Sequence, residues 1–131
     1  MTEFILGGGK GTIVTDPQGI LRLTWTPGSI VEADGATEAV LAVQRLSGKE
    51  MRPLLVALTD VHLAAGARRI FLETRFVAAV ALVGATVVDR VVAAALQRKR
   101  KCPQAFFTST VVAVEWLEGL PAPEGAEGIP A

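Results

Sequence analysis

The spacing of hydrophobic residues changes along the chain, and the N-terminal part has the pattern of β-strands. Residues 12–15 and 20–26 are rich in β-branched side chains, and Asp16-Pro17-Gln18-Gly19 between them is a turn sequence. This pattern predicts an antiparallel hairpin. The glycine-rich segment 7–11 before it is expected to be a flexible joint or turn.

The rest of the chain alternates between short apolar runs and apolar residues at helical spacing. The runs 54–58 and 77–83 are too short for buried helices and indicate strands covered on both faces. A further short strand is expected at 105–108. The expected helices cover residues 34–47, 64–74, 86–101 and 110–118.

The order of these elements, β-β-α-β-α-β-α-β-α, predicts the fold class. Right-handed crossovers would give an α/β domain in which the N-terminal hairpin leads into a mainly parallel sheet flanked by four helices. We expect this domain to cover residues 1–120. Residues 121–131 contain three prolines and two glycines and are expected to form a flexible C-terminal tail.

Residues with capping side chains stand at three of the expected helix starts. Asp34 and Thr110 are expected to cap the first and last helices. Thr86 precedes Asp89 by three residues, which is the spacing of a capping box with the shorter acid.

Composition excludes several classes of protein. The chain has 131 residues, of which 50% are hydrophobic, so it forms one domain with a sizeable core. One cysteine and one histidine exclude an internal disulfide and an ordinary Cys/His zinc site, and we expect no metal and no cofactor. The longest apolar stretch, 76–85, has ten residues, whereas a spanning helix needs about 20. We therefore expect a soluble cytoplasmic protein without a membrane span.

The charges are balanced overall but unevenly distributed. Thirteen basic residues match thirteen acidic ones, which disfavours a general binder of nucleic acid. Between residues 62 and 101, however, eight basic residues face two acidic ones. The run Arg98, Lys99, Arg100 and Lys101 is a candidate anion-binding site. Alternatively, it is a solvated helix end whose cations complement the helix dipole.

The candidate ligand-binding residues follow the two central strands. Asp60 and His62 come after the first of these strands, and ligands of α/β sheets bind near such strand ends. Gly84 precedes a helix start whose N–H groups are available to an anion, and Arg90 would add further donors. The alternatives are a capped turn at Asp60, an exposed loop residue at His62 and a surface ion pair at Arg90. No nucleophile stands beside His62, and we assign no catalytic residue.

Several short motifs of the second half of the chain resemble a known domain. They are the strand ending in Val83-Gly84, the capped helix with Arg90, the strand ending in Phe107-Thr108 and the closing helix with Trp116-Leu117. Together with the element order they resemble the STAS domain, the fold of anti-sigma-factor antagonists. They are more similar still to a group of small bacterial STAS-like proteins of unassigned function. The resemblance covers about residues 12–118 and implies a STAS-like fold.

One departure from the STAS pattern concerns its phosphorylation site. The resemblance implies a phosphorylatable serine in an Asp-Ser-Ser-Gly-like segment at the start of the helix after the central strand. In that register this chain has Leu63, Ala64 and Ala65, and only Gly66 agrees. The usual phosphoswitch is therefore expected to be absent.

An apolar stripe on the third expected helix suggests a function. It is richer than a small monomer needs, and surplus apolar surface commonly meets a partner. We therefore predict a non-catalytic protein-interaction or regulatory module that self-associates as a homodimer. The alternative is a small-molecule or lipid site in a pocket between sheet and helices, near the four candidate ligand-binding residues. The stripe consists of Val87, Val88, Val91, Val92, Ala95 and Leu96.

Overall fold

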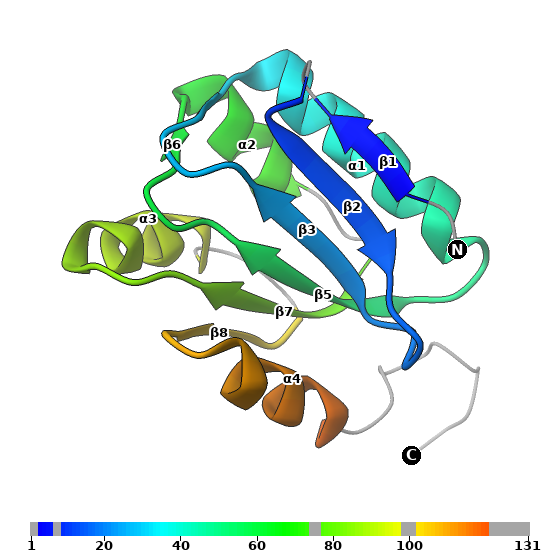
Figure 1. Cartoon of the computed structure of the whole chain (residues 1–131). Coiled ribbons are helices and arrows are strands. Elements are labelled where there is room, and N and C mark those ends of the chain that lie inside the picture. The colour runs from blue at the N-terminus through cyan, green and yellow to red at the C-terminus, as the bar shows by residue number, and fades with distance from the viewer. Residues whose placement is uncertain (1–2, 7–8, 74–76, 98–101, 121–131) are drawn as a thin grey trace.

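The structure of the chain, a computed structural model, describes residues 3–6, 9–73, 77–97 and 102–120 (Figure 1). Strands and helices alternate as the hydrophobic pattern predicts, and the α/β fold class is confirmed. In chain order the elements are β1 (Glu3–Leu6), β2 (Gly11–Thr15), β3 (Leu21–Trp25), β4 (Ile30–Val31), α1 (Ala33–Ser47), β5 (Arg52–Ala57), β6 (His62–Leu63), α2 (Ala65–Glu73), β7 (Val77–Val83), α3 (Val87–Gln97), β8 (Gln104–Phe107) and α4 (Thr110–Glu118).

The larger sheet brings the ends of four parallel strands to one edge. Within the described residues it has six strands in the order β1-β2-β3-β5-β7-β8. The first three strands pair antiparallel, whereas β3, β5, β7 and β8 run parallel. A small sheet of two parallel strands, β4 and β6, joins the segments that leave β3 and β5. The loops after β5 and β7, where the candidate residues lie, are therefore neighbours.

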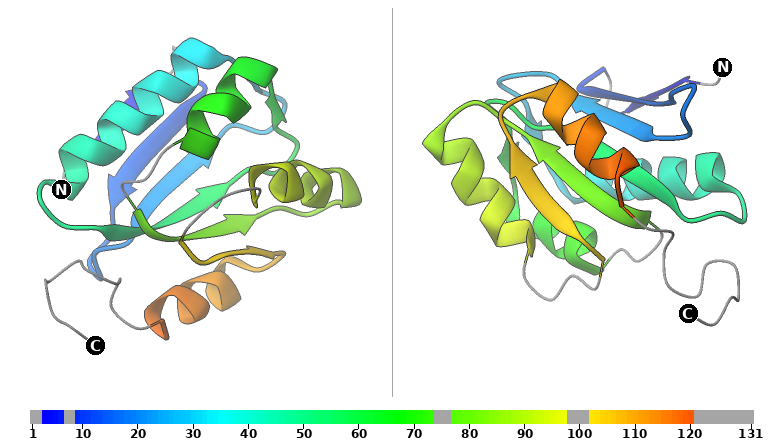
Figure 2. Two further views of the ribbon diagram at one scale, coloured as in Figure 1. Left: turned by 180° about the vertical axis from the view of Figure 1, so that it is seen from behind. Right: turned by 90° about the horizontal axis from the view of Figure 1, so that it is seen from below.

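Helices cover the two faces of the larger sheet unequally (Figure 2). The parallel strands lie side by side in chain order, so right-handed crossovers place α1, α2 and α3 on the same face. The last helix, α4, packs on the opposite face against β5, β7 and β8. Val80 and Leu82 of β7 belong to the core under the first three helices. Ala81 and Val83 belong to a smaller core with Leu117 of α4.

The short strands β1, β4 and β6 are absent from the predicted element order. β1 pairs with β2 across the glycine-rich segment, with Phe4 opposite Ile13. β4 and β6 are two-residue bridges in which Ile30 pairs with His62. Such short strands depend on a partner from elsewhere in the chain, and their own sequences are too short to show a period.

The helix starts confirm one capping prediction and correct two. α1 begins at Ala33, so Asp34 lies in the first turn, where its carboxylate accepts a hydrogen bond from the N–H of Gly35. α4 is capped by Ser109, whose Oγ accepts from the N–H of Val112, and Thr110 is the first helical residue. At α3 the predicted capping box is confirmed by the hydrogen bonds described below. The run 98–101 and the tail 121–131 lie outside the described residues.

Candidate functional site

Three of the four candidate ligand-binding residues lie around the carboxyl ends of β5 and β7. Asp60 is in the turn after β5, Gly84 directly follows β7, and Arg90 is in the first turns of α3. Asp60 has a positive φ of 54°, a left-handed conformation that aspartate tolerates better than most residues. Its carbonyl oxygen accepts a hydrogen bond of 2.7 Å from the N–H of Gly28.

Asp89, which the sequence indicated only as a helix cap, is the residue that joins these loops. Its side chain is buried, with 2% of the residue exposed. Oδ1 accepts a hydrogen bond of 3.0 Å from the N–H of Asp60. Oδ2 accepts hydrogen bonds of 2.7 Å from the N–H of Ala85 and 3.1 Å from the N–H of Thr86. In return, the N–H of Asp89 donates to Oγ1 of Thr86 at 3.1 Å, which completes the capping box.

These hydrogen bonds keep Asp89 ionised without a basic partner among the described residues. Burial by itself raises the pKa of the Asp89 carboxyl, because it disfavours the charged form. The N–H groups of Ala85, Thr86 and Asp60 and the Thr86 hydroxyl outweigh burial and lower this pKa below its ordinary value of 3.8. The helix dipole acts in the same direction, because its positive end lies at the start of α3.

This arrangement weakens the anion-binding interpretation of the helix start. An external anion at that place would compete with the Asp89 carboxylate for the N–H groups around the helix start. The N–H groups of Ala85, Thr86 and Asp89 are already engaged, and two of them bind the Asp89 carboxylate. The same negative charge would repel an added anion.

Gly84 and Arg90 have packing partners in this region. A Cβ on Gly84 would lie 2.6 Å from Cβ of Asp89 and 3.0 Å from a ring carbon of Phe106, so glycine is required for the close approach of α3. The guanidinium carbon of Arg90 lies 4.9 Å from the centre of the Phe106 ring, which is within cation–π distance. Within the described residues Arg90 forms no ion pair.

His62 does not join this group. It lies in β6, where its N–H donates to the carbonyl oxygen of Ser29 at 3.0 Å, and its side chain is exposed. No hydrogen bond between the side chains of His62 and Asp60 is present. Among the described residues there is also no group of three or more acidic, histidine or cysteine side chains able to hold a metal ion.

The apolar stripe of α3 divides into a buried and an exposed part. Leu96 is buried and Val92 is partly buried against the core. Val87, Val88 and Val91 are 77%, 70% and 64% exposed. The stripe therefore runs around the helix, and its N-terminal valines turn away from the sheet. The side chain of Ala95 is not among those that the structure describes.

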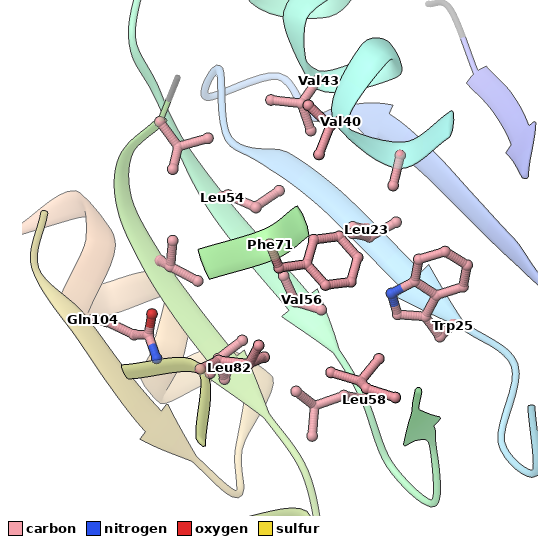
Figure 3. A pocket seen from close by; sticks show the side chains of 15 residues that line it. Leu23, Trp25, Val40, Val43, Leu54, Val56, Leu58, Phe71, Leu82 and Gln104 are labelled. Carbon is pink, nitrogen blue, oxygen red and sulfur yellow. The ribbon is translucent and has the colours of Figure 1, made fainter. Parts of the chain in front are cut away.

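A cavity of about 50 Å³ lies between the sheet and the helices, as one alternative predicted, but at a different place (Figure 3). None of the four candidate residues lines it. Its walls are mostly apolar side chains, and the polar groups among them are the amide of Gln104 and the indole N–H of Trp25. Oε1 of Gln104 is buried without a hydrogen-bond partner in the described part of the chain. Such an unpaired acceptor costs roughly 1–3 kcal/mol.

Comparison with family models matches residues 13–120 to a family described as Domain of unknown function (DUF7793). The chain belongs to this family. No curated protein matches the sequence. A similar solved structure is that of an uncharacterized protein of the DUF3478 family with a SpoIIAA-like fold, from Shewanella loihica PV-4. The two chains share 14% identity with a TM-score of 0.62, over 82% of this chain and 91% of that one.

This likeness confirms the STAS-like fold of this DUF7793 chain, because the SpoIIAA-like fold is STAS-like. At such low identity the likeness concerns the fold alone. In addition, the helices in the described part of the chain are all too short or too polar to cross a bilayer.

Proposed function

We propose that this protein is a non-catalytic interaction module that associates with a second copy of itself through the outward face of α3. The observation that carries the proposal is the exposure of Val87, Val88 and Val91. We call these residues the valine face. Ala94, one turn after Val91, is also exposed and extends the face along the helix.

The valine face has the geometry of a helix-packing surface. Val87, Val91 and Ala94 follow one another at the i, i+4 and i+7 positions, which lie on one side of a helix. The opposite side of α3 carries the buried Ala93 and Leu96. A helix that is apolar on both sides is typical of one packed on both sides. The small side chain of Ala94 would allow a second helix to approach closely.

A second copy of the chain is the partner that this surface favours. A two-fold axis across α3 would bring the two valine faces together, so that the valine face of each copy covers that of the other. With thirteen basic and thirteen acidic residues, the copies carry no net charge that would oppose association. Regulation by the usual phosphoswitch of STAS antagonists has no support, because Ala65 stands at the start of α2 where the resemblance implies a serine.

Analytical ultracentrifugation of matched variants tests the proposal. We expect the wild-type chain to sediment as a dimer and Val91→Glu to sediment as a monomer at the same concentration. Covering one valine contributes at least about 1.5 kcal/mol, so its loss from both copies would weaken association by roughly 100-fold.

The control for this experiment is Val111→Glu on α4. Val111 is 69% exposed, close to the exposure of Val91, but it lies outside the valine face. We expect this variant to remain a dimer. A monomeric wild type across the accessible concentrations, or a dimer unaffected by Val91→Glu, would overturn the proposal.

A further inference from the structure

The apolar cavity lies beneath the helices, over the middle of the larger sheet (Figure 3). Leu23 of β3, Val56 of β5 and Leu82 of β7 form part of its floor. Val40 of α1 and Leu54 of β5 also line it and are only partly buried, which marks the side nearest to solvent. The cavity is separate from the valine face.

Trp25, at the end of β3, presents one edge of its indole ring to this cavity. Its Cε3 and Cζ3 atoms abut Gly11 of β2, where an added Cβ would lie 2.6 and 2.9 Å from them. Nε1 is on the opposite edge of the ring and therefore points away from β2. Because β5 lies on the other side of β3, this edge faces the cavity, as Figure 3 shows.

The indole N–H of Trp25 is a hydrogen-bond donor without a partner. The residue is only 2% exposed, and its N–H has no acceptor among the described residues. The side-chain atoms that are both unpaired and fully enclosed include Oε1 of Gln104 but not Nε1 of Trp25, so the indole N–H remains within reach of a ligand. A water molecule in this place would have the indole N–H as its one reachable side-chain partner, whereas a buried water typically makes about three hydrogen bonds. The cavity is therefore better suited to an organic molecule than to water.

We propose that the cavity binds a small, neutral, mostly aliphatic molecule whose single oxygen accepts a hydrogen bond from the indole N–H of Trp25. The apolar walls would leave a charged group without solvation, which excludes ions. A hydroxyl hydrogen would find no acceptor there, so an ether or ketone oxygen suits the site better than an alcohol. The volume of about 50 Å³ is well below the roughly 150 Å³ of a cavity that takes benzene, which restricts the ligand to a few non-hydrogen atoms.

The probes for this site are two isomers, dimethyl ether and ethanol, which have the same atoms and nearly the same size. Each is titrated into ¹⁵N-labelled protein, and the Nε1–H proton of Trp25 is followed by NMR. We expect dimethyl ether to shift this proton downfield in a saturable way, because a hydrogen bond to oxygen deshields it. Ethanol should bind about tenfold more weakly, since its hydroxyl loses water without gaining an acceptor. The indole N–H of Trp116, on α4 at the opposite face of the sheet, is the internal reference and should not move.

Two variants of α1 locate the binding site. Ala39 lines the cavity, so Ala39→Val adds two methyl groups to its wall and should abolish the shift. Ala42→Val is the matched control, because Ala42 is also buried on α1 but does not line the cavity, and it should keep the shift. An unmoved Trp25 signal, equal shifts at Trp25 and Trp116, ethanol binding as tightly as the ether, or a shift that survives Ala39→Val would each overturn the inference. None of these results depends on whether the chain forms a dimer.

Discussion

Asp89 is the side chain on which the arrangement of the β5 and β7 loops depends most. It accepts hydrogen bonds from both loops while it is buried and ionised. Hydrogen bonds to a charged group are stronger than neutral ones, and removal of the Asp89 carboxylate leaves several partly buried N–H groups without an acceptor.

Replacing Asp89 by Asn should destabilise the fold by about 2 kcal/mol at neutral pH, because the amide nitrogen meets N–H groups that need an acceptor. Urea unfolding monitored by tryptophan fluorescence measures the change. The control is Asp34→Asn, since Asp34 is exposed and accepts from a single N–H group, that of Gly35. The control should change stability by less than about 0.5 kcal/mol.

The difference between wild type and Asp89→Asn should depend on pH. The pKa of Asp89 is lower in the folded than in the unfolded chain, so the unfolded chain binds more protons as the solution is acidified. The contribution of Asp89 is thus fully present above the ordinary pKa of 3.8 and is lost as pH falls through the lower, folded value. Unfolding measured from pH 6 to pH 2 should show the two proteins converging in acid, and a constant difference would contradict this account.

Gly84→Ala should destabilise the chain by about 1–3 kcal/mol, because the added Cβ would lie 2.6 Å from Cβ of Asp89. Gly35→Ala, in α1, should have the opposite sign. A Cβ there meets only Val31, at an ordinary distance of 3.7 Å, and alanine favours a helix by about 0.5–1 kcal/mol. Thermal unfolding of both variants tests the pair, and a neutral Gly84→Ala would show that the close contact relaxes.

Among the secondary-structure elements, α4 is one whose start differs from the sequence prediction. The sequence indicated Thr110 as its capping residue, whereas Ser109 caps it in the structure. Ser109→Ala should destabilise the chain by about 1 kcal/mol, because the N–H of Val112 loses its acceptor. Thr110→Ala should be nearly neutral, since Thr110 already lies inside the helix. Chemical denaturation compares the two, and a larger effect at Thr110 would restore the capping role that the sequence predicted.

The elements that the sequence predicted best are those whose signal is local. The run Val77–Val83 is uninterrupted and apolar, and it forms β7 with these same limits. The expected end of the first helix at residue 47 is the end of α1, and Gly48 follows it with a φ of 61°. By contrast, β4 and β6 exist only because two distant segments meet, and no local period records such a meeting.

The site was predictable only in part for the same reason. The spacing of Thr86 and Asp89 predicted a capping box, which is an interaction within one segment. The hydrogen bond from Asp60 to Asp89 joins the turn after β5 to the first turn of α3, and the sequence contains no signal for it. The apolar stripe on this helix predicted surplus apolar surface, but helical spacing alone did not show that Val87 and Val91 would be the exposed part of the stripe.

In the molecule as a whole, the apolar residues that remain exposed distinguish the two sides of α3. One side completes the core over the sheet, and the other presents the valine face to solvent. An isologous dimer would cover this second side in both copies at once. In the proposed dimer, the methyl groups of Val87 and Val91 of one copy therefore lie against those of the other.

Isotope-filtered NOE spectroscopy on an equimolar mixture of ¹³C-labelled and unlabelled protein tests that claim most directly. The account predicts intermolecular NOEs to the methyl groups of Val87 and Val91 and none to those of Val111. Intermolecular NOEs confined to other residues, or none in a sample that sediments as a dimer, would contradict it.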